Sequence, residues 1–141
     1  MVDSKSISVL CVDDNEHVAE ALRVKLRIMG GFEWKGWLAD ADELVEAVEK
    51  LCPDVVLLDI DMPGADPFAQ LGSVSELCPG TRVLMFSGHV RRELVDKAIE
   101  GGAWGYVSKN DGEDALVAAI CAVAAGQFIL SPEVRLACER E

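Results

Sequence analysis

The sequence predicts an α/β fold in which an open, parallel sheet is doubly wound, with helices on both faces. Short apolar segments alternate with amphipathic stretches along the whole chain, and the connections between them are a few residues long. Two of the apolar segments, VVLL and VLMF, are uninterrupted runs of large residues. Such runs are typical of interior strands of a parallel sheet, because both faces of those strands are buried.

Five strands are predicted from the apolar segments. We expect them at residues 7–12, 34–39, 54–58, 82–86 and 104–107. The second segment is more mixed in polarity than the others, which predicts that this strand lies at an edge of the sheet.

Five helices are predicted after the strands, from apolar residues at helical spacing and from start and stop signals. The apolar positions are Val18, Leu22, Leu26 and Met29 in the first helix, Leu44, Ala47, Val48 and Leu51 in the second, and Leu94, Val95, Ala98 and Ile99 in the fourth. Asp40 or Asp42 is the expected N-cap of the second helix. Asp66, which is followed by a proline, is the expected N-cap of the third, and the fifth covers residues 112–125.

The composition limits the classes of protein to consider. The chain has 141 residues, which suits one domain that buries its own core, and its five scattered cysteines indicate neither a zinc site nor a disulfide framework. The formal net charge of -12 argues against direct nucleic-acid binding by this chain, because phosphate backbones would be repelled. No apolar run approaches the roughly 20 residues of a membrane span, and the start does not resemble a signal peptide. We therefore expect a cytoplasmic protein without membrane contact.

Polar side chains follow four of the predicted strands at the point where each strand ends. These residues are Asp13 and Asp14 after the first strand, Asp59 and Asp61 after the third, Ser87 after the fourth and Lys109 after the fifth. Open parallel sheets bind their ligands beyond the carboxyl ends of the strands. If the first and third strands are neighbours, Asp13, Asp14 and Asp59 converge at that edge.

Three converging carboxylates would repel one another, and a hard divalent cation such as Mg²⁺ would remove the repulsion. A lysine and a hydroxyl opposite them would complete a site for a phosphoryl group, with Asp59 best placed as the nucleophile towards phosphorus. Each residue alone has a simpler explanation: Asp13 or Asp14 could cap the following helix, Ser87 could be a turn hydroxyl, and Lys109 a surface charge. Their joint placement at four strand ends favours the phosphoryl site.

Four motifs, VLCVDDN, PDVVLLDIDMPG, VLMFSG and GAWGYVSK, occur in this order along the chain. Together they resemble the receiver domain of response regulators in two-component signalling, and the resemblance covers residues 6–127. It implies a flavodoxin-like fold with a five-stranded parallel sheet of strand order 2-1-3-4-5. It also implies that Asp59 accepts a phosphoryl group from the phospho-His of a histidine kinase or phosphotransfer protein, or from a small phosphodonor.

The resemblance further implies roles for the neighbouring residues. Asp14 would bind Mg²⁺, or Mn²⁺, directly, and Asp13 would bind it through water. Asp59 would contribute a carboxylate oxygen and Asp61 its backbone carbonyl. Lys109 would pair with Asp59 and then with the phosphoryl group.

Ser87 and Tyr106 are the implied switch residues. Ser87 would hydrogen-bond the phosphoryl group and Tyr106 would rotate inward behind it, which would shift the surface formed by the fourth helix, the fifth strand and the fifth helix. The same surface is a candidate face for a homodimer. From its residue type alone, Tyr106 could instead be an ordinary strand residue.

The chain departs from the common pattern of the family close to the site. Asn110 stands where a proline often follows the lysine. Asp61 lies two residues beyond Asp59, and His89 lies at the same spacing from Ser87, so that both flank the phosphoryl group. We hypothesise that they tune the lifetime of phospho-Asp59, with Asp61 orienting or repelling the attacking water.

Residues 128–141 form a tail beyond the part that resembles a receiver domain. The sequence Ser131-Pro132-Glu133 in this tail is a good helix start. The tail resembles the end of receiver domains that are joined to a LuxR-type helix-turn-helix output domain, and is expected to begin a linker helix. The sequence leaves open whether the chain is a receiver domain from a longer regulator or a stand-alone one.

Three other functions compete with this interpretation. The pair Asp59-x-Asp61 is also the nucleophile motif of haloacid-dehalogenase-like phosphatases, although the pair usually follows the first strand in that class. A flavodoxin would share the fold, but the segment DDNEHVAE is unsuited to cradle the phosphate of FMN. A phosphorylation-independent interaction module would typically lack one of the key residues, all of which are present here. We therefore expect a protein that accepts one phosphoryl group, and not an enzyme that turns over a substrate.

Overall fold

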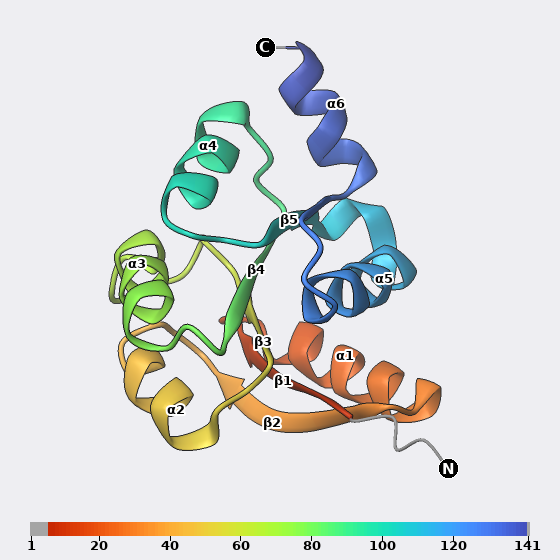
Figure 1. Cartoon of the computed structure of the whole chain (residues 1–141). Coiled ribbons are helices and arrows are strands. Elements are labelled where there is room, and N and C mark those ends of the chain that lie inside the picture. Colours follow the sequence, from red (N-terminus) through yellow and green to blue (C-terminus); the bar gives the residue numbers. More distant parts are fainter. Residues whose placement is uncertain (1–5, 141) are drawn as a thin grey trace.

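The computed structural model describes residues 6–140. Their strands form one parallel sheet of six strands in the order β2-β1-β3-β4-β5-β6, of which Figure 1 labels the first five along the chain. The strands are β1 Ile7–Val12, β2 Phe32–Leu38, β3 Val55–Leu58, β4 Arg82–Ser87, β5 Gly105–Ser108 and β6 Ile129–Leu130. The α-helices are α1 Glu16–Met29, α2 Leu44–Leu51, α3 Pro67–Leu77, α4 Arg92–Glu100, α5 Gly112–Ala124 and α6 Pro132–Arg140. A short 3₁₀ helix, η1 Lys109–Asp111, joins β5 to α5.

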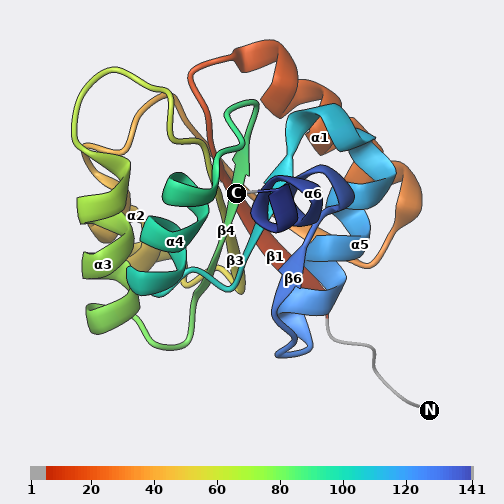
Figure 2. The ribbon, with the colours of Figure 1, turned by 90° about the horizontal axis from the view of Figure 1, so that it is seen from above.

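Helices cover both faces of the sheet, as predicted. Helices α1 and α5 lie on one face and α2, α3 and α4 on the other, as the view from above shows (Figure 2). In β1, Val9 and Cys11 pack into the apolar core under α1 and α5, whereas Leu10 and Val12 pack into the core on the opposite face. Successive residues of a strand point to opposite faces, so the four residues from Val9 to Val12 are all apolar. In the part of the chain that the structure describes, no helix is both long and apolar enough to cross a membrane.

The sheet has one strand more than the sequence predicted. The flavodoxin-like order of the first five strands is confirmed, as is the edge position of β2, but the prediction of five strands is wrong. The sixth strand pairs in parallel with β5, with Ile129 opposite Gly105 and Leu130 opposite Tyr106. A strand of two residues carries no periodic pattern of its own, and its hydrogen bonds depend entirely on the presence of β5.

The predicted N-cap of the second helix is also wrong. Helix α2 begins after Glu43, whose side chain makes no capping hydrogen bond. The Asp40 carboxylate instead accepts the backbone N–H of Asp42 at 2.9 Å, and the Asp42 carboxylate accepts that of Ala65 at 2.6 Å. The Asp42 side chain, one of the two expected to cap the helix, therefore makes a tertiary contact with the loop between β3 and α3 instead.

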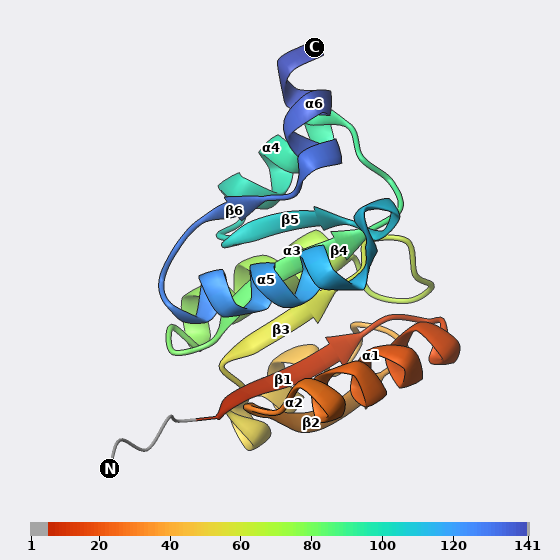
Figure 3. The same cartoon turned by 90° about the vertical axis from the view of Figure 1, so that its right-hand side faces the viewer.

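The tail forms a helix at the predicted start and packs on the rest of the molecule. Helix α6 lies next to α4 and β5 (Figure 3). Its Val134 is fully buried, in the same core as Tyr106 and Val95. The tail is thus packed as part of the core, while the domain boundary at residue 127 stays a prediction.

We expect Val134→Ala to lower the free energy of unfolding by about 2 kcal/mol, because it removes two buried methyl groups and leaves a cavity. Leu136→Ala, on the same helix but with its side chain half exposed, is the matched control and should cost under about 1 kcal/mol. Urea denaturation monitored by circular dichroism measures both values. Equal effects of the two substitutions would contradict the packing of α6 on the core.

Candidate functional site

Backbone hydrogen bonds fix the position of the two acids that follow the central strands. Val12 and Leu58, the last residues of β1 and β3, are register partners. The next residue of each strand is therefore an aspartate at the same edge of the sheet. The backbone N–H of Asp59 donates to the carbonyl of Val12 at 3.0 Å, and that of Asp13 to the carbonyl of Leu38 at 3.0 Å. The two carboxyl groups are placed by the strand pairing itself.

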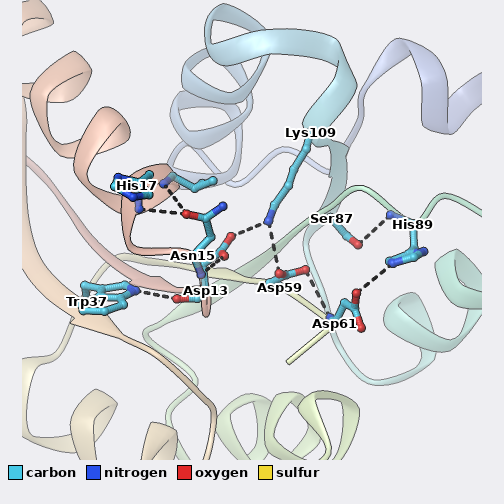
Figure 4. A network of polar contacts seen from close by, with 10 residues as sticks. Asp13, Asn15, His17, Trp37, Asp59, Asp61, Ser87, His89 and Lys109 are labelled. Atoms are coloured by element: carbon cyan, nitrogen blue, oxygen red, sulfur yellow. Dashed lines mark hydrogen bonds and ion pairs between the residues drawn. The ribbon is translucent and has the colours of Figure 1, made fainter. Parts of the chain in front are cut away.

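The carboxylates meet one ammonium group at this edge (Figure 4). Asp13 and Asp59 are 1% and 4% exposed, whereas Asp14 is exposed. Lys109 Nζ lies 2.6 Å from Asp13 Oδ2 and 3.2 Å from Asp59 Oδ2. One ammonium group thus forms ion pairs with two buried carboxylates, and the site keeps a net negative charge.

The site has the donor set that a hard divalent cation requires. Asp13, Asp14 and Asp59 each offer a carboxylate oxygen, and these oxygens lie within 4.8 Å of one another. Together with the ammonium of Lys109, the three carboxylates carry a net charge of minus two, which a divalent cation neutralises. Because all the donors are oxygens, the residues fit Mg²⁺ or Mn²⁺.

Burial and charge shift the pKa values of the groups that meet here. Burial raises the pKa of the Asp59 carboxyl, and the nearby Asp13 carboxylate raises it further, against the opposing effect of the Lys109 ammonium. Burial alone would lower the pKa of Lys109, but its contacts with Asp13 and Asp59 outweigh that effect and raise it. The raised pKa of Lys109 favours its charged form, whereas the raised pKa of Asp59 means that ionisation of this carboxyl group costs free energy in the folded protein.

Two residues that the sequence did not single out hold Asp13. Its carboxylate accepts the backbone N–H of Asn15 at 2.9 Å, and the indole N–H of Trp37, from β2, donates to its backbone carbonyl at 2.6 Å. Asn15 is also the N-cap of α1, where its side chain accepts the backbone N–H groups of His17 and Val18. The capping role considered for Asp13 or Asp14 belongs to Asn15 instead, which leaves the two aspartates directed to the site.

His89, in the loop between β4 and α4, is the centre of a second set of contacts. Its backbone N–H donates to Ser87 Oγ at 3.0 Å, and its carbonyl accepts the Tyr106 hydroxyl at 2.6 Å. Its ring Nε2 lies 3.1 Å from Asp61 Oδ2, and the Asp61 backbone N–H donates to Asp59 Oδ1 at 3.3 Å. The residues predicted to switch or tune the site are therefore linked to one another through one loop residue.

Ser87 and Tyr106 do not contact the carboxylates themselves. Ser87 is fully buried and Tyr106 is 1% exposed, so both hydroxyls lie in the interior beside the His89 loop. Burial raises the pKa of Tyr106 to about 12, although a hydrogen bond with the Ser87 hydroxyl opposes the effect. The tyrosine therefore stays a neutral hydrogen-bond donor at physiological pH.

Known proteins share this sequence pattern and fold. Residues 9–121 match the family described as "Response regulator receiver domain". The transcriptional regulatory protein DegU of Brevibacillus brevis is 32% identical over 133 residues, which cover 94% of this chain and 56% of DegU. The response regulator UvrY of Escherichia coli K12 is 29% identical over 91% of this chain and 59% of UvrY. The chain thus spans little more than half the length of these relatives.

Solved structures agree with this assignment. The crystal structure of a LuxR-family two-component response regulator from Aurantimonas sp. SI85-9A1 superposes with a TM-score of 0.89, at 29% identity and with 96% of each chain covered. The isolated receiver domain of RcsB from Salmonella enterica superposes with a TM-score of 0.85 at 19% identity, a likeness that bears on the fold alone. It covers 94% of this chain and 98% of that one.

The protein belongs to the response regulator receiver domain family. It is a receiver domain of the kind found in two-component response regulators, and similar in sequence to DegU, UvrY and other response regulators. These domains are signalling proteins. The alternative of a haloacid-dehalogenase-like phosphatase is not supported, because the family match extends over both aspartate motifs and the lysine motif.

We expect Asp59→Asn to be more stable than the wild type at pH 7 in the absence of divalent cations. A carboxyl group whose pKa is raised by folding contributes stability below its unfolded-state pKa, and that contribution is lost as the pH rises through the folded-state pKa. Ionised Asp59 therefore destabilises the folded protein at pH 7, and replacing its carboxylate with an uncharged amide removes this destabilisation. The measurement is the urea midpoint of unfolding for both proteins in EDTA, at pH 7 and again near pH 4. The difference in midpoint between Asp59→Asn and the wild type should be smaller near pH 4.

Asp14→Asn, which changes an exposed carboxylate of the same cluster, is the control and should shift the midpoint less. A pH 7 midpoint of Asp59→Asn at or below that of the wild type would contradict the destabilising effect of the buried charge.

Proposed function

We propose that Asp59 accepts a phosphoryl group from the phospho-His of a histidine kinase or phosphotransfer protein, or from a small phosphodonor. The observation that supports this most is the meeting of the Asp13 and Asp59 carboxylates with the Lys109 ammonium, at 2.6 and 3.2 Å, beside the exposed Asp14. Groups of this kind can bind a divalent cation and a phosphoryl group at the same time, with one buried carboxylate as the nucleophile.

In this reaction a carboxylate oxygen of Asp59 forms a P–O bond while the bond from phosphorus to the donor breaks. The electron pair of that bond leaves with the donor, which for phospho-His is the imidazole nitrogen. Lys109 pairs with Asp59 before the transfer and with the phosphoryl oxygens afterwards. Asp14, Asp13, Asp59 and the backbone carbonyl of Asp61 would hold Mg²⁺ or Mn²⁺, whose bound charge would stabilise the phosphoryl oxygens.

The switch role of Ser87 and Tyr106 remains part of the proposal. Tyr106 is buried and its hydroxyl donates to the carbonyl of His89, which supports a role in coupling the site to this loop. Ser87 Oγ accepts the backbone N–H of His89, and its own hydroxyl proton would turn from Tyr106 to a phosphoryl group on Asp59. Phosphorylation would then rearrange the loop at His89 and shift the balance between two conformations of the adjoining surface.

The output of this chain is proposed to be control of transcription, because DegU is named a transcriptional regulatory protein. With a net charge of -12, the chain itself is not expected to bind nucleic acid. It would act in the cytoplasm, as a phosphorylated partner and not as an enzyme with a turned-over substrate. A homodimer through α4, β5 and α5 would also involve α6, since α6 contacts both α4 and β5.

The test of phosphoryl transfer is the intact mass of the chain after incubation with acetyl phosphate or phosphoramidate and Mg²⁺. We expect a single phosphoryl adduct on the wild type, no adduct on Asp59→Asn, and no adduct when EDTA replaces Mg²⁺. Absence of an adduct with every donor would contradict the proposal and favour a phosphorylation-independent interaction module. Turnover of a phosphate ester would point instead to a phosphatase.

We further expect Asp61→Ala to change the rate at which phospho-Asp59 is hydrolysed by about threefold or more. The Asp61 carboxylate lies at the rim of the site, held towards the β4–α4 loop by His89, where it can orient or repel the attacking water. The rate is measured from the decay of the adduct mass after removal of the donor. Asp66→Ala, in the same loop but bonded to the backbone of Phe68, is the control, and equal decay of Asp61→Ala and wild type would contradict the hypothesis.

A further inference from the structure

The C-terminal segment reaches the turn that carries Lys109. After β6, the backbone N–H of Ser131 donates to the carbonyl of Tyr106 at 3.1 Å, and the Ser131 hydroxyl accepts the backbone N–H of Ser108 at 2.9 Å. Ser131 and Ser108 are both buried. These bonds fix the start of α6 against the carboxyl end of β5, next to the site.

Glu133 then binds the turn from outside the sheet. Its carboxylate accepts the Ser108 hydroxyl and the side-chain amide of Asn110, the latter at 3.2 and 3.4 Å. Its backbone N–H donates to the Asp111 carboxylate at 3.0 Å. Three of the four residues from Ser108 to Asp111 are therefore held by Glu133, and the fourth is Lys109.

Asn110 is the residue that makes this arrangement possible. Its backbone N–H donates to Ser108 Oγ at 3.0 Å, and its side chain donates to Glu133. Proline, which often follows the lysine in the family, has neither an N–H group nor a side-chain amide, so it could make neither bond. The departure from the family pattern at this position thus coincides with the contact between the turn and α6.

The two sides of the turn have different partners. Lys109 points from η1 to the carboxylates of Asp13 and Asp59, whereas Ser108, Asn110 and Asp111 are bonded to α6. Because the turn is only three residues long, a displacement on one side is transmitted to the other. The buried Val134 keeps α6 from sliding over β5 without loss of core packing.

We propose that Glu133 is a positioning residue for Lys109, so that the place of α6 and the phosphorylation of Asp59 are coupled. The inference rests on the proposed function, since it assigns a second task to the same site. Coupling of this kind is reciprocal. A phosphoryl group that moves Lys109 weakens or strengthens the hydrogen bonds between the turn and α6. A displacement of α6, in turn, alters the rate of the reaction at Asp59. Glu133 lies in the tail, outside the segment that the sequence assigned to the receiver domain.

The experiment compares Glu133→Ala with Glu139→Ala, which removes the same type of side chain from an exposed position of the same helix. We expect Glu133→Ala to form the Asp59 adduct about tenfold more slowly with acetyl phosphate, because small displacements of a catalytic group cost up to ~100-fold. Glu139→Ala should react at the wild-type rate. Glu133→Gln keeps an acceptor oxygen and should recover most of the rate, and Asn110→Ala should reproduce part of the loss.

Hydrogen exchange gives a readout that a purely structural role would not move. In the wild type, phosphorylation should change amide exchange in the peptide covering residues 128–140, and this change should be lost in Glu133→Ala but kept in Glu139→Ala. Wild-type rates and a retained exchange change in Glu133→Ala would overturn the inference while the proposed function stands. A wild type that forms no adduct would overturn the proposed function, and the inference with it.

Discussion

Asp13 and Asp59 are buried side by side because they follow two strands that are register partners, and the pairing of β1 with β3 leaves them no other position. Two buried carboxylates are costly to keep ionised, and the Lys109 ammonium offsets only part of the cost. A divalent cation would neutralise the unbalanced negative charge, and the proposed transfer of a phosphoryl group to Asp59 depends on such a cation. This electrostatic cost thus lies at the edge of the sheet where the proposed phosphoryl transfer would take place.

The charge of Lys109 is useful only where the turn after β5 places it. That turn is short, and its other two residues, Asn110 and Asp111, are both bonded to Glu133 of the C-terminal segment. The same segment covers part of the surface formed by α4 and β5, the surface that the family resemblance assigns to output. The candidate site and this surface therefore share one structural element, which offers a physical route for the proposed coupling.

Most of the site could be predicted from the sequence because the positions of strand ends follow from topology. The apolar runs gave the positions of parallel strands, whose carboxyl ends lie at one edge of the sheet, and Asp13, Asp59 and Lys109 were found in this way. The order of the strands came from the resemblance to receiver domains. The supporting residues could not be found by this reasoning. The indole of Trp37 reaches the Asp13 carbonyl from another strand, and no local pattern marks such a contact.

The incorrect predictions have a common physical cause, which is that a tertiary contact decided a local structure. Asp42 has a residue type suited to capping α2, but the loop after β3 offers its carboxylate a backbone N–H at 2.6 Å. Ile129 and Leu130 form a strand only because β5 presents free backbone groups to them. A pattern of one or two residues indicates only a conformational preference, and the neighbouring element determines which local structure forms.

The two margins of the sheet show how a protein of this kind avoids joining other sheets. At one margin, β6 has two residues and is followed at once by Ser131 and Pro132, and proline has no N–H to offer an incoming strand. At the other margin, β2 carries the ion pair of Lys35 with Glu33 and an irregular register near Gly36, and both features hinder a regular ladder with a further chain. The segment that holds the lysine turn therefore also closes the sheet, so a substitution that freed it would expose β5 to aggregation as well as disturb the site.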